Sequence, residues 1–305
     1  MTAHPIVTTV RVHAPATIPL HLGVGEPHGT GTRDVVTVLH AVDLYDELVI
    51  TRAARLRVTT TGARGAPEDV QNVAGAAART FADHLGVAAA VSIEITKRIP
   101  VGVGLAGASA DAAGALVGCA ALWGADLSRD ELAAIGAEIR PGVPFSLSGG
   151  TALGAGGDER LSPVLARTPL HWVLAMAGTR LAAPTAMAQI DRLRASGSSR
   201  HAGDVRDILA ALGSGDPTRV AEHLANDFEP AAISLMPALR QTRRAGLDAG
   251  ALAAVVVGAG PTIALLAASR EAAEKVAAEL AGSGTCRAVQ LASGPVPGAR
   301  VVGSE

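Results

Sequence analysis

The feature that most constrains this chain is a glycine-rich segment at residues 99–113, between a short expected strand and an alanine-rich helix. From residue 100 to residue 109 it reads Pro-Val-Gly-Val-Gly-Leu-Ala-Gly-Ala-Ser. Glycines let backbone N–H groups approach a phosphate closely, and the start of a helix adds partial positive charge. No Gly-Lys-Ser or Gly-Lys-Thr follows, so the segment is not a Walker A loop. It predicts either a phosphate-binding loop of another class or a turn needed only for packing.

The composition indicates a globular protein and argues against nucleic-acid binding and a membrane span. The chain has 305 residues, enough for two medium domains with separate cores, and 49% of them are hydrophobic, as in a globular protein. A net charge of -2 and only 2% aromatic residues argue against a nucleic-acid partner. The longest apolar stretch, residues 251–268, is interrupted by two glycines and a proline, which argues against a membrane span. Because Cys119 and Cys286 lack metal-ligand spacing, we expect reduced thiols, no metal site and a cytoplasmic protein.

The residue patterns predict an α+β chain with two domains. We expect strands at residues 6–12, 47–60, 91–95, 171–177, 252–257, 263–266 and 286–291, and helices at 71–86, 129–138, 184–195, 204–212, 216–225, 229–245 and 270–282. The pattern becomes mainly helical after residue 181. We therefore place one domain at residues 1–165 and the other at residues 166–305.

Several segments together resemble the GHMP family of small-molecule kinases. Residues 99–113 resemble the family's phosphate-binding motif, residues 13–22 its first motif, and residues 256–262 its third, glycine-rich motif. Two further stretches, residues 143–154 and 294–302, resemble one branch of the family, the 4-diphosphocytidyl-2-C-methyl-D-erythritol kinases. The resemblance implies a two-domain GHMP kinase fold, with an N-terminal α/β domain that holds the phosphate loop and a C-terminal ferredoxin-like domain. It also implies a substrate cleft between the two domains.

The same resemblance implies a nucleotide site at the glycine-rich loop. Carried over by motif, the lining residues would be Lys97, Gly102, Gly104, Gly107, Ser109 and Ala110. The loop departs from the family pattern at Val103 and Ala108, where relatives usually have glycine. A methyl group at position 108 would restrict a positive φ beside the phosphate path, which weakens the inference of nucleotide binding. Ser109 would cap the following helix or face the phosphates.

The residues that the family uses for phosphoryl transfer are replaced. Its first motif is Pro-Ala-Lys-(Val/Ile)-Asn, whereas this chain has Thr17 for the lysine and Pro19 for the asparagine. Relatives carry an aspartate directly before Val-Pro-Phe, where this chain has Gly142. In the family the lysine and aspartate act on the attacking hydroxyl, which needs a carboxylate to orient it and a cation to offset charge. The catalytic residues of this chain are therefore unknown from its sequence.

The substrate side is altered as well. Relatives have Gly-Tyr-His-Glu in the first hairpin, where this chain has Gly-Thr-Arg-Asp at residues 31–34. Near residue 183, relatives have a small polar residue before a proline and an aromatic residue three positions after it, where this chain has Ala183 and Met187. By motif, the residues expected to line the substrate cleft are Thr17, Pro19, His21, Thr32, Arg33, Asp34, Arg140, Gly142, Ala183 and Met187.

Three hypotheses follow for the function. The first is a divergent homologue that has lost ATP-dependent phosphoryl transfer and now binds, cyclises or rearranges a more hydrophobic small molecule of specialised metabolism, with no cofactor. The second is an active 4-diphosphocytidyl-2-C-methyl-D-erythritol kinase that uses ATP and Mg²⁺. The third is a non-catalytic pseudokinase that regulates a partner. For the chain as a whole we expect a small-molecule ligand, no nucleic acid and no membrane, and a homodimer is left open.

Overall fold

The computed structural model describes residues 7–29, 33–62, 71–155, 161–199 and 201–305. Its first sheet is built around a long antiparallel hairpin formed by β1 (Thr9–Pro27) and β2 (Arg33–Arg52). Further strands extend this hairpin: β12 (Arg300–Ser304) and β8 (Ala225–Asn226) pair with β1, β4 (Val91–Thr96) and β5 (Thr151–Ala155) with β2, β3 (Arg57–Thr61) with β4, and β6 (Leu161–Pro163) with β5. Buried residues alternate along the start of β1, which therefore packs one face on a core.

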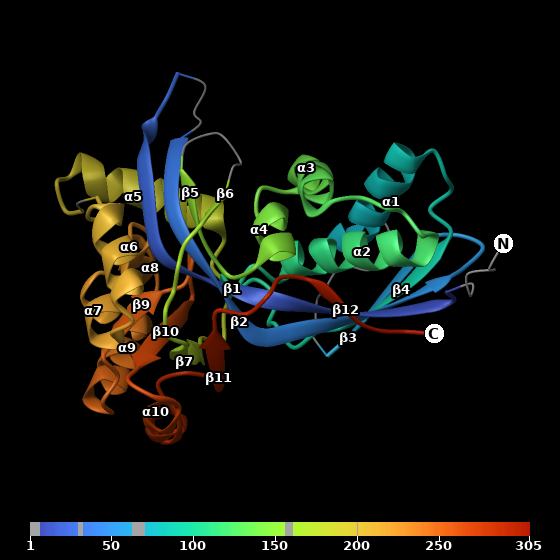
Figure 1. Ribbon diagram of the computed structural model, residues 1–305. Helices are drawn as coiled ribbons and strands as arrows, with labels where there is room; N and C mark the ends of the chain where they lie inside the picture. The colour runs from blue at the N-terminus through green and yellow to red at the C-terminus, as the bar shows by residue number, and fades with distance from the viewer. Residues whose placement is uncertain (1–6, 30–32, 63–70, 156–160, 200) are drawn as a thin grey trace.

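Four helices cover one face of this sheet (Figure 1). They are α1 (Val73–Leu85), α2 (Gly107–Trp123), α3 (Arg129–Ile139) and α4 (Val143–Ser148). Helix α2 is rich in alanine and glycine, so its backbone lies close to the strands: a Cβ at Gly118 would overlap Ile50 Cδ1. The expected helix start at Ser128 is confirmed, with Glu131 completing a capping box.

The second sheet has the order β11-β7-β10-β9 and is antiparallel throughout. Its strands are β7 (Leu170–Met176), β9 (Ala253–Val256), β10 (Thr262–Ala267) and β11 (Ala288–Gly294). The helices of this half are α5 (Ala183–Ala195), α6 (Val205–Ser214), α7 (Pro217–Glu222), α8 (Glu229–Leu235), α9 (Ala238–Asp248) and α10 (Arg270–Ser283). The prediction of a two-part α+β architecture is confirmed.

Two element predictions were wrong for local reasons. The single helix expected at residues 229–245 is two helices, because Pro237 lacks a backbone N–H and disfavours a helical residue before it. The single strand expected at residues 47–60 is the end of β2 followed by β3. The predicted domain boundary between residues 165 and 166 separates the two sheets except for β8 and β12, which both pair with β1 in the first sheet. We keep that boundary as a proposal.

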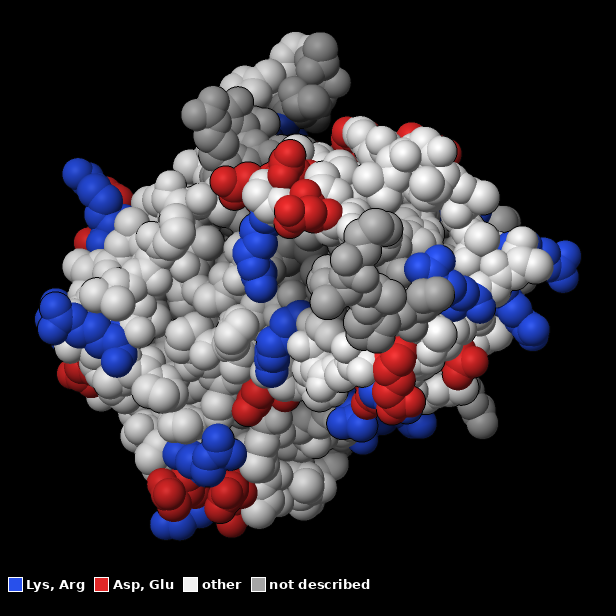
Figure 2. All heavy atoms as spheres, turned by 45° about the vertical axis from the view of Figure 1, so that its right-hand side comes forward, with Lys and Arg blue, Asp and Glu red and all other residues white. Residues whose placement is uncertain are grey.

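Charged groups are spread thinly over the molecule. On the face shown in Figure 2, basic and acidic side chains alternate in small groups between wide uncharged areas. In the described residues, no helix is both long enough and apolar enough to cross a membrane. These observations give no reason to revise the expectation of a small-molecule ligand.

The close packing of α2 yields a stability prediction. We expect Gly118→Ala to lower the urea midpoint, because overlap with Ile50 should cost about 1–3 kcal/mol, more than the roughly 1 kcal/mol that alanine adds as a helix former. Gly282→Ala is the matched control, since Gly282 lies in α10 with open space around it, and its midpoint should hold or rise. Equal shifts for the two variants would contradict the close contact of α2 with the sheet.

Candidate active site

A cavity of about 570 Å³ lies where the glycine-rich loop meets the second half of the chain. Its walls come from the loop and the start of α2, the turn before α4, the start of α5, and the turn between β9 and β10. The lining residues include Gly102, Gly104, Gly107, Ala108, Ser109, Arg140, Gly142, Ala183, Gly258 and Gly260. The structure therefore brings together most of the predicted nucleotide residues and three of the predicted cleft residues.

The loop holds a backbone shape that depends on glycine. Gly104 has a φ of 93°, and a Cβ there would collide with the carbonyl oxygen of Val257. Ala106 has a φ of 58° and is the only described non-glycine residue with a positive φ. Ala108 is helical, so the predicted restriction at that position was wrong. Helix α2 starts after Ala106 without a side-chain cap, which differs from the cap expected of Ser109 and leaves N–H groups at the helix start available to an anion.

The turn between β9 and β10 is held in shape by Asn226 on β8. Its Nδ2 donates hydrogen bonds to the carbonyl oxygens of Val256 (2.6 Å) and Gly258 (2.7 Å), and its Oδ1 accepts one from the N–H of Phe228. A Cβ on Gly258 would lie 3.2 Å from the carbonyl oxygen of Gly104, so the two turns are in direct contact. Asn226 thus links β8 to the turn that contacts the glycine-rich loop.

A buried ion cluster anchors the loop at both ends. Lys97 Nζ donates to the carboxylates of Asp46 on β2 and Asp111 on α2, the latter at 2.6 Å. The other oxygen of Asp46 accepts from the backbone N–H groups of Arg98 (2.7 Å) and Ile99 (2.8 Å). One carboxylate therefore fixes where the loop leaves β4, and the lysine links that point to Asp111 in the second turn of α2.

Burial and charge compete within this cluster. Burial alone lowers the pKa of Lys97, but the two carboxylates outweigh it, so the pKa is raised and the amine stays charged. Burial raises the pKa of Asp111 to about 7, while Lys97 pulls it down and Asp46 pushes it up. Asp111 Oδ1 is buried without a hydrogen-bond partner among the described residues. Asp111 is therefore the member of the cluster that changes charge near neutral pH.

Basic side chains gather beside the loop in a second cavity of about 550 Å³. It shares Pro100 and Val103 with the first cavity. The basic residues that line it are Lys97, Arg98, Arg180 and Arg287. The Arg180 side chain packs over the loop, since a Cβ on Gly102 would lie 3.1 Å from Arg180 Cδ. Sequence reasoning missed Arg180 and Arg287, because nothing in their local sequence places them near residue 102.

Of the three positions at which the family's residues for phosphoryl transfer are replaced, only Gly142 lines the first cavity. Thr17 is 4% exposed on β1, and its N–H donates to the carbonyl oxygen of Leu105 at 3.2 Å, so it contacts the loop backbone without lining the cavity. Pro19 is buried on the same strand. A Cβ at Gly142 would lie 2.7 Å from Ser109 Oγ, so a side chain at position 142 would have to displace that hydroxyl.

The other predicted cleft residues lie elsewhere. Arg33 on β2 forms an ion pair with Asp191 on α5 (2.6 Å) and donates a hydrogen bond to the carbonyl oxygen of Gly25 (3.0 Å). These two contacts, here called the Arg33 clasp, hold the hairpin to α5. Met187 packs in the apolar cluster under this clasp. His21 and Asp34 line a separate, smaller cavity, which contains no residue of the other two. Ala110 is buried behind the loop, and Thr32 lies outside the described residues.

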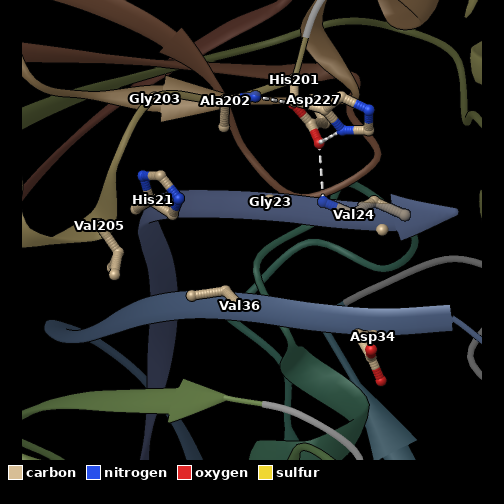
Figure 3. Close-up of a pocket in the computed structure, with 11 residues that line it drawn as sticks. His21, Gly23, Val24, Asp34, Val36, His201, Ala202, Gly203, Val205 and Asp227 are labelled. Atoms are coloured by element: carbon tan, nitrogen blue, oxygen red, sulfur yellow. Dashed lines mark hydrogen bonds and ion pairs between the residues drawn. The ribbon is translucent and has the colours of Figure 1, made fainter.

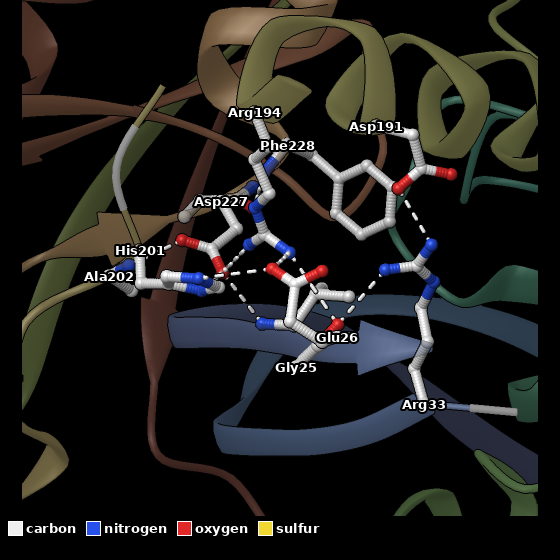
Figure 4. A network of polar contacts seen from close by, with 11 residues as sticks. Gly25, Glu26, Arg33, Asp191, Arg194, His201, Ala202, Asp227 and Phe228 are labelled. Carbon is white, nitrogen blue, oxygen red and sulfur yellow. Dashed lines mark hydrogen bonds and ion pairs between the residues drawn. The ribbon is translucent and has the colours of Figure 1, made fainter. Parts of the chain in front are cut away.

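A second polar network holds the hairpin to the C-terminal half (Figure 4). Asp227 is 3% exposed and accepts from the N–H of Val24 (2.7 Å), from Arg194 (2.8 Å) and from the N–H of Ala202. Because one buried carboxylate joins β1, α5 and the segment after α5, it sets the position of the hairpin above the cavity. The sequence analysis offered no signal for this role.

The titration of Asp111 gives a pH prediction. The pKa of Asp111 is about 7 in the folded protein, above its usual value near 3.8. The contribution of Asp111 to the free energy of unfolding is therefore complete below about pH 4 and is lost as pH rises to about 7. His40 opposes this trend, since burial lowers its pKa to about 4 and its contribution is lost as pH falls from 6.5. We therefore expect Asp111→Asn to differ from the parent in the slope of the urea midpoint between pH 4 and 7, losing less stability as pH rises. Identical slopes would contradict a buried, titrating Asp111.

Comparison with known proteins places the chain in a family. It matches the model of the GHMP kinases N terminal domain over residues 72–150 and that of the GHMP kinases C terminal region over residues 208–285. Proteins of Nocardia farcinica (strain IFM 10152) and Rhodococcus jostii (strain RHA1), both named 4-diphosphocytidyl-2-C-methyl-D-erythritol kinase, are 50% and 49% identical to it. The matches cover 98% of this chain and 98% of the first protein, and 96% and 95% for the second.

Solved structures agree on the fold. A crystal structure of 4-(cytidine 5'-diphospho)-2C-methyl-D-erythritol kinase aligns with a TM-score of 0.76 at 28% identity, covering 93% of this chain and 98% of that one. A homoserine kinase from Cytophaga hutchinsonii ATCC 33406 reaches the same TM-score at 20% identity, covering 99% of this chain and all of that one, and shows the fold alone. The chain therefore belongs to the GHMP kinase family, with the two-domain fold of that family, and is similar to 4-diphosphocytidyl-2-C-methyl-D-erythritol kinases over nearly its whole length.

Proposed function

We propose that this chain binds a nucleoside triphosphate at the glycine-rich loop and transfers its γ-phosphoryl group to a small alcohol in the adjoining cavity. The observation that carries this proposal is the loop, whose glycine backbone and uncapped helix start face the cavity. The relatives' name makes 4-diphosphocytidyl-2-C-methyl-D-erythritol the first acceptor to test. Identity of about 50% over nearly the whole chain supports this active-kinase hypothesis better than it supports a loss of activity.

The described residues fit a bound triphosphate. The start of α2 offers N–H groups and the positive end of a 17-residue helix. Arg180 and Arg287 add cationic groups in the adjoining second cavity, and Lys97 anchors the end of the loop to α2. Among the described residues no group of three or more His, Cys, Asp or Glu forms a metal cage. A Mg²⁺ ion that arrives with the triphosphate needs only one or two protein carboxylates, so this finding is compatible with an ATP–Mg²⁺ substrate.

The residues at positions 17 and 142 make the chemical step slow. Phosphoryl transfer is driven by positioning and by cations that offset the charge developing on the transferred group. Thr17 has no charge to contribute, and Gly142 has no side chain to orient the attacking hydroxyl. Each missing group typically costs about 10²- to 10⁴-fold in rate. The proposal therefore combines intact nucleotide binding with weak turnover.

A second function is favoured by the same two positions. The cavity wall beside the loop presents Ala183, Leu181 and Ala259, and the cluster under the Arg33 clasp is apolar. A cleft without the lysine and aspartate suits a more hydrophobic ligand that is bound or rearranged without phosphoryl transfer. On this hypothesis no cofactor is needed. The third hypothesis, a pseudokinase that regulates a partner, stays a prediction from the sequence.

Nucleotide binding can be tested through Arg180. We expect ATP with Mg²⁺ to bind in isothermal titration, and Arg180→Gln to weaken the affinity about tenfold, as loss of a charged hydrogen bond does. Arg244→Gln is the matched control, because Arg244 is an exposed residue of α9 that pairs only with Asp248 and lies outside both cavities. Binding that neither substitution changes would remove Arg180 from the site, and no binding at all would contradict the proposed function.

Turnover can be tested by restoring the family's residues. We expect the parent to phosphorylate 4-diphosphocytidyl-2-C-methyl-D-erythritol slowly, and Thr17→Lys with Gly142→Asp to raise kcat at least about 100-fold. Thr17→Met with Gly142→Asn is the control, since it adds similar bulk without the charges. Unfolding midpoints would show whether the displaced Ser109 hydroxyl disturbs folding. If ATP binds but neither parent nor restored variant transfers phosphate, the second function is the correct one.

A further inference from the structure

A third cavity, of about 250 Å³, lies between the β1–β2 hairpin and the segment after α5 (Figure 3). It contains none of the residues that line the two cavities at the glycine-rich loop. The motifs of the sequence place two of its residues, His21 and Asp34, in the substrate cleft, but in the structure both belong to the lining of this separate space. Neither proposed function uses it.

The cavity exists because glycines stand where other strands carry side chains. A Cβ on Gly23 would lie 3.4 Å from His21 Nε2 and 3.9 Å from the Cβ of Ala202, which places it inside the cavity. Gly203 leaves its own side open, with no atom within 4 Å of an added Cβ. Val36 and Val205 supply apolar walls. The space is therefore small, largely apolar and preformed.

His21 is the polar group of this cavity that lacks a partner. The residue is 3% exposed, and its imidazole makes no hydrogen bond to any described residue. Burial lowers its pKa, against the opposing effect of Asp227 and Asp204, so the ring is neutral at pH 7 and carries one donor and one acceptor. His21 Nε2 lies 3.4 Å from the position of an added Cβ on Gly23, at the wall of the cavity. A ligand hydroxyl in the cavity can therefore form a hydrogen bond with the ring.

The charged residues around the cavity are already paired. Asp227 is occupied by Arg194 and by the N–H groups of Val24 and Ala202. Asp34 pairs with His28 at 3.0 Å, and both side chains are exposed. No cluster in the described part of the chain has the three His, Cys, Asp or Glu residues that a metal ion needs. These contacts favour an uncharged ligand over an ion.

We propose that this cavity is a second binding site, separate from the nucleotide loop, for a small uncharged molecule with an apolar body and one hydroxyl group. His21 makes the hydrogen bond to that hydroxyl, and Val36 and Val205 pack against the body. The proposal stands on the geometry of the hairpin and does not depend on whether the chain transfers phosphate.

Phenol is a suitable probe, with benzene as the comparison that lacks the hydroxyl. The full chain, with ring-¹⁵N-labelled histidine, is titrated while the NMR signals of His21 are followed. We expect saturable shifts with phenol and about fivefold weaker binding of benzene, the worth of one hydrogen bond. His21→Phe should keep the apolar contacts and make the two ligands bind equally, which a merely structural histidine would not do.

Filling the cavity provides the second arm of the test. Gly23→Val places methyl groups beside His21 and should abolish the phenol shifts. Gly154→Val is the matched control, because Gly154 lies on β5, pairs with β2 and would make only ordinary contacts through an added Cβ. The proposal is overturned if His21 shows no saturable shift up to the solubility of phenol. It is also overturned if the shifts persist unchanged in Gly23→Val.

Discussion

The glycine-rich loop takes its shape from the ion cluster of Lys97, Asp46 and Asp111. A loop built from glycine has little conformational preference of its own, so its ends must be held by other parts of the fold. Asp46 on β2 binds the backbone at the start of the loop, and Lys97 carries that anchor to α2. The amides of the loop are thus positioned by charged side chains of β2, of α2 and of the segment after β4.

The cavity itself needs both halves of the chain. The turn between β9 and β10 contacts the loop at Gly104, and Asn226 on β8 holds the shape of that turn. Asp227, the next residue, fixes the β1–β2 hairpin through Arg194 and Val24. Two adjacent side chains therefore position two different segments, one of the C-terminal half and one of the hairpin.

Sequence reasoning predicted what local pattern encodes and missed what only packing creates. The glycine-rich segment, the family and the α+β architecture follow from motifs, spacing and periodicity. The break at Pro237 was missed but could have been predicted from the sequence, because proline disfavours a helical residue before it. The position of Arg180 could not have been predicted, since its place over Gly102 depends on how the second sheet docks against the first. The separate cavity at His21 was hidden for the same reason: alternation along a strand does not say which face looks into the cleft.

Because β12 pairs with β1, the first sheet can be completed only after the second half of the chain has been synthesised. In chain order this strand follows the entire second sheet, yet it pairs with β1 beside Thr9 and His13. During synthesis the first sheet therefore lacks both β8 and β12 until most of the second domain has left the ribosome. The edge of β1 that these strands cover is unpaired throughout that interval, which leaves it open to pairing with other chains.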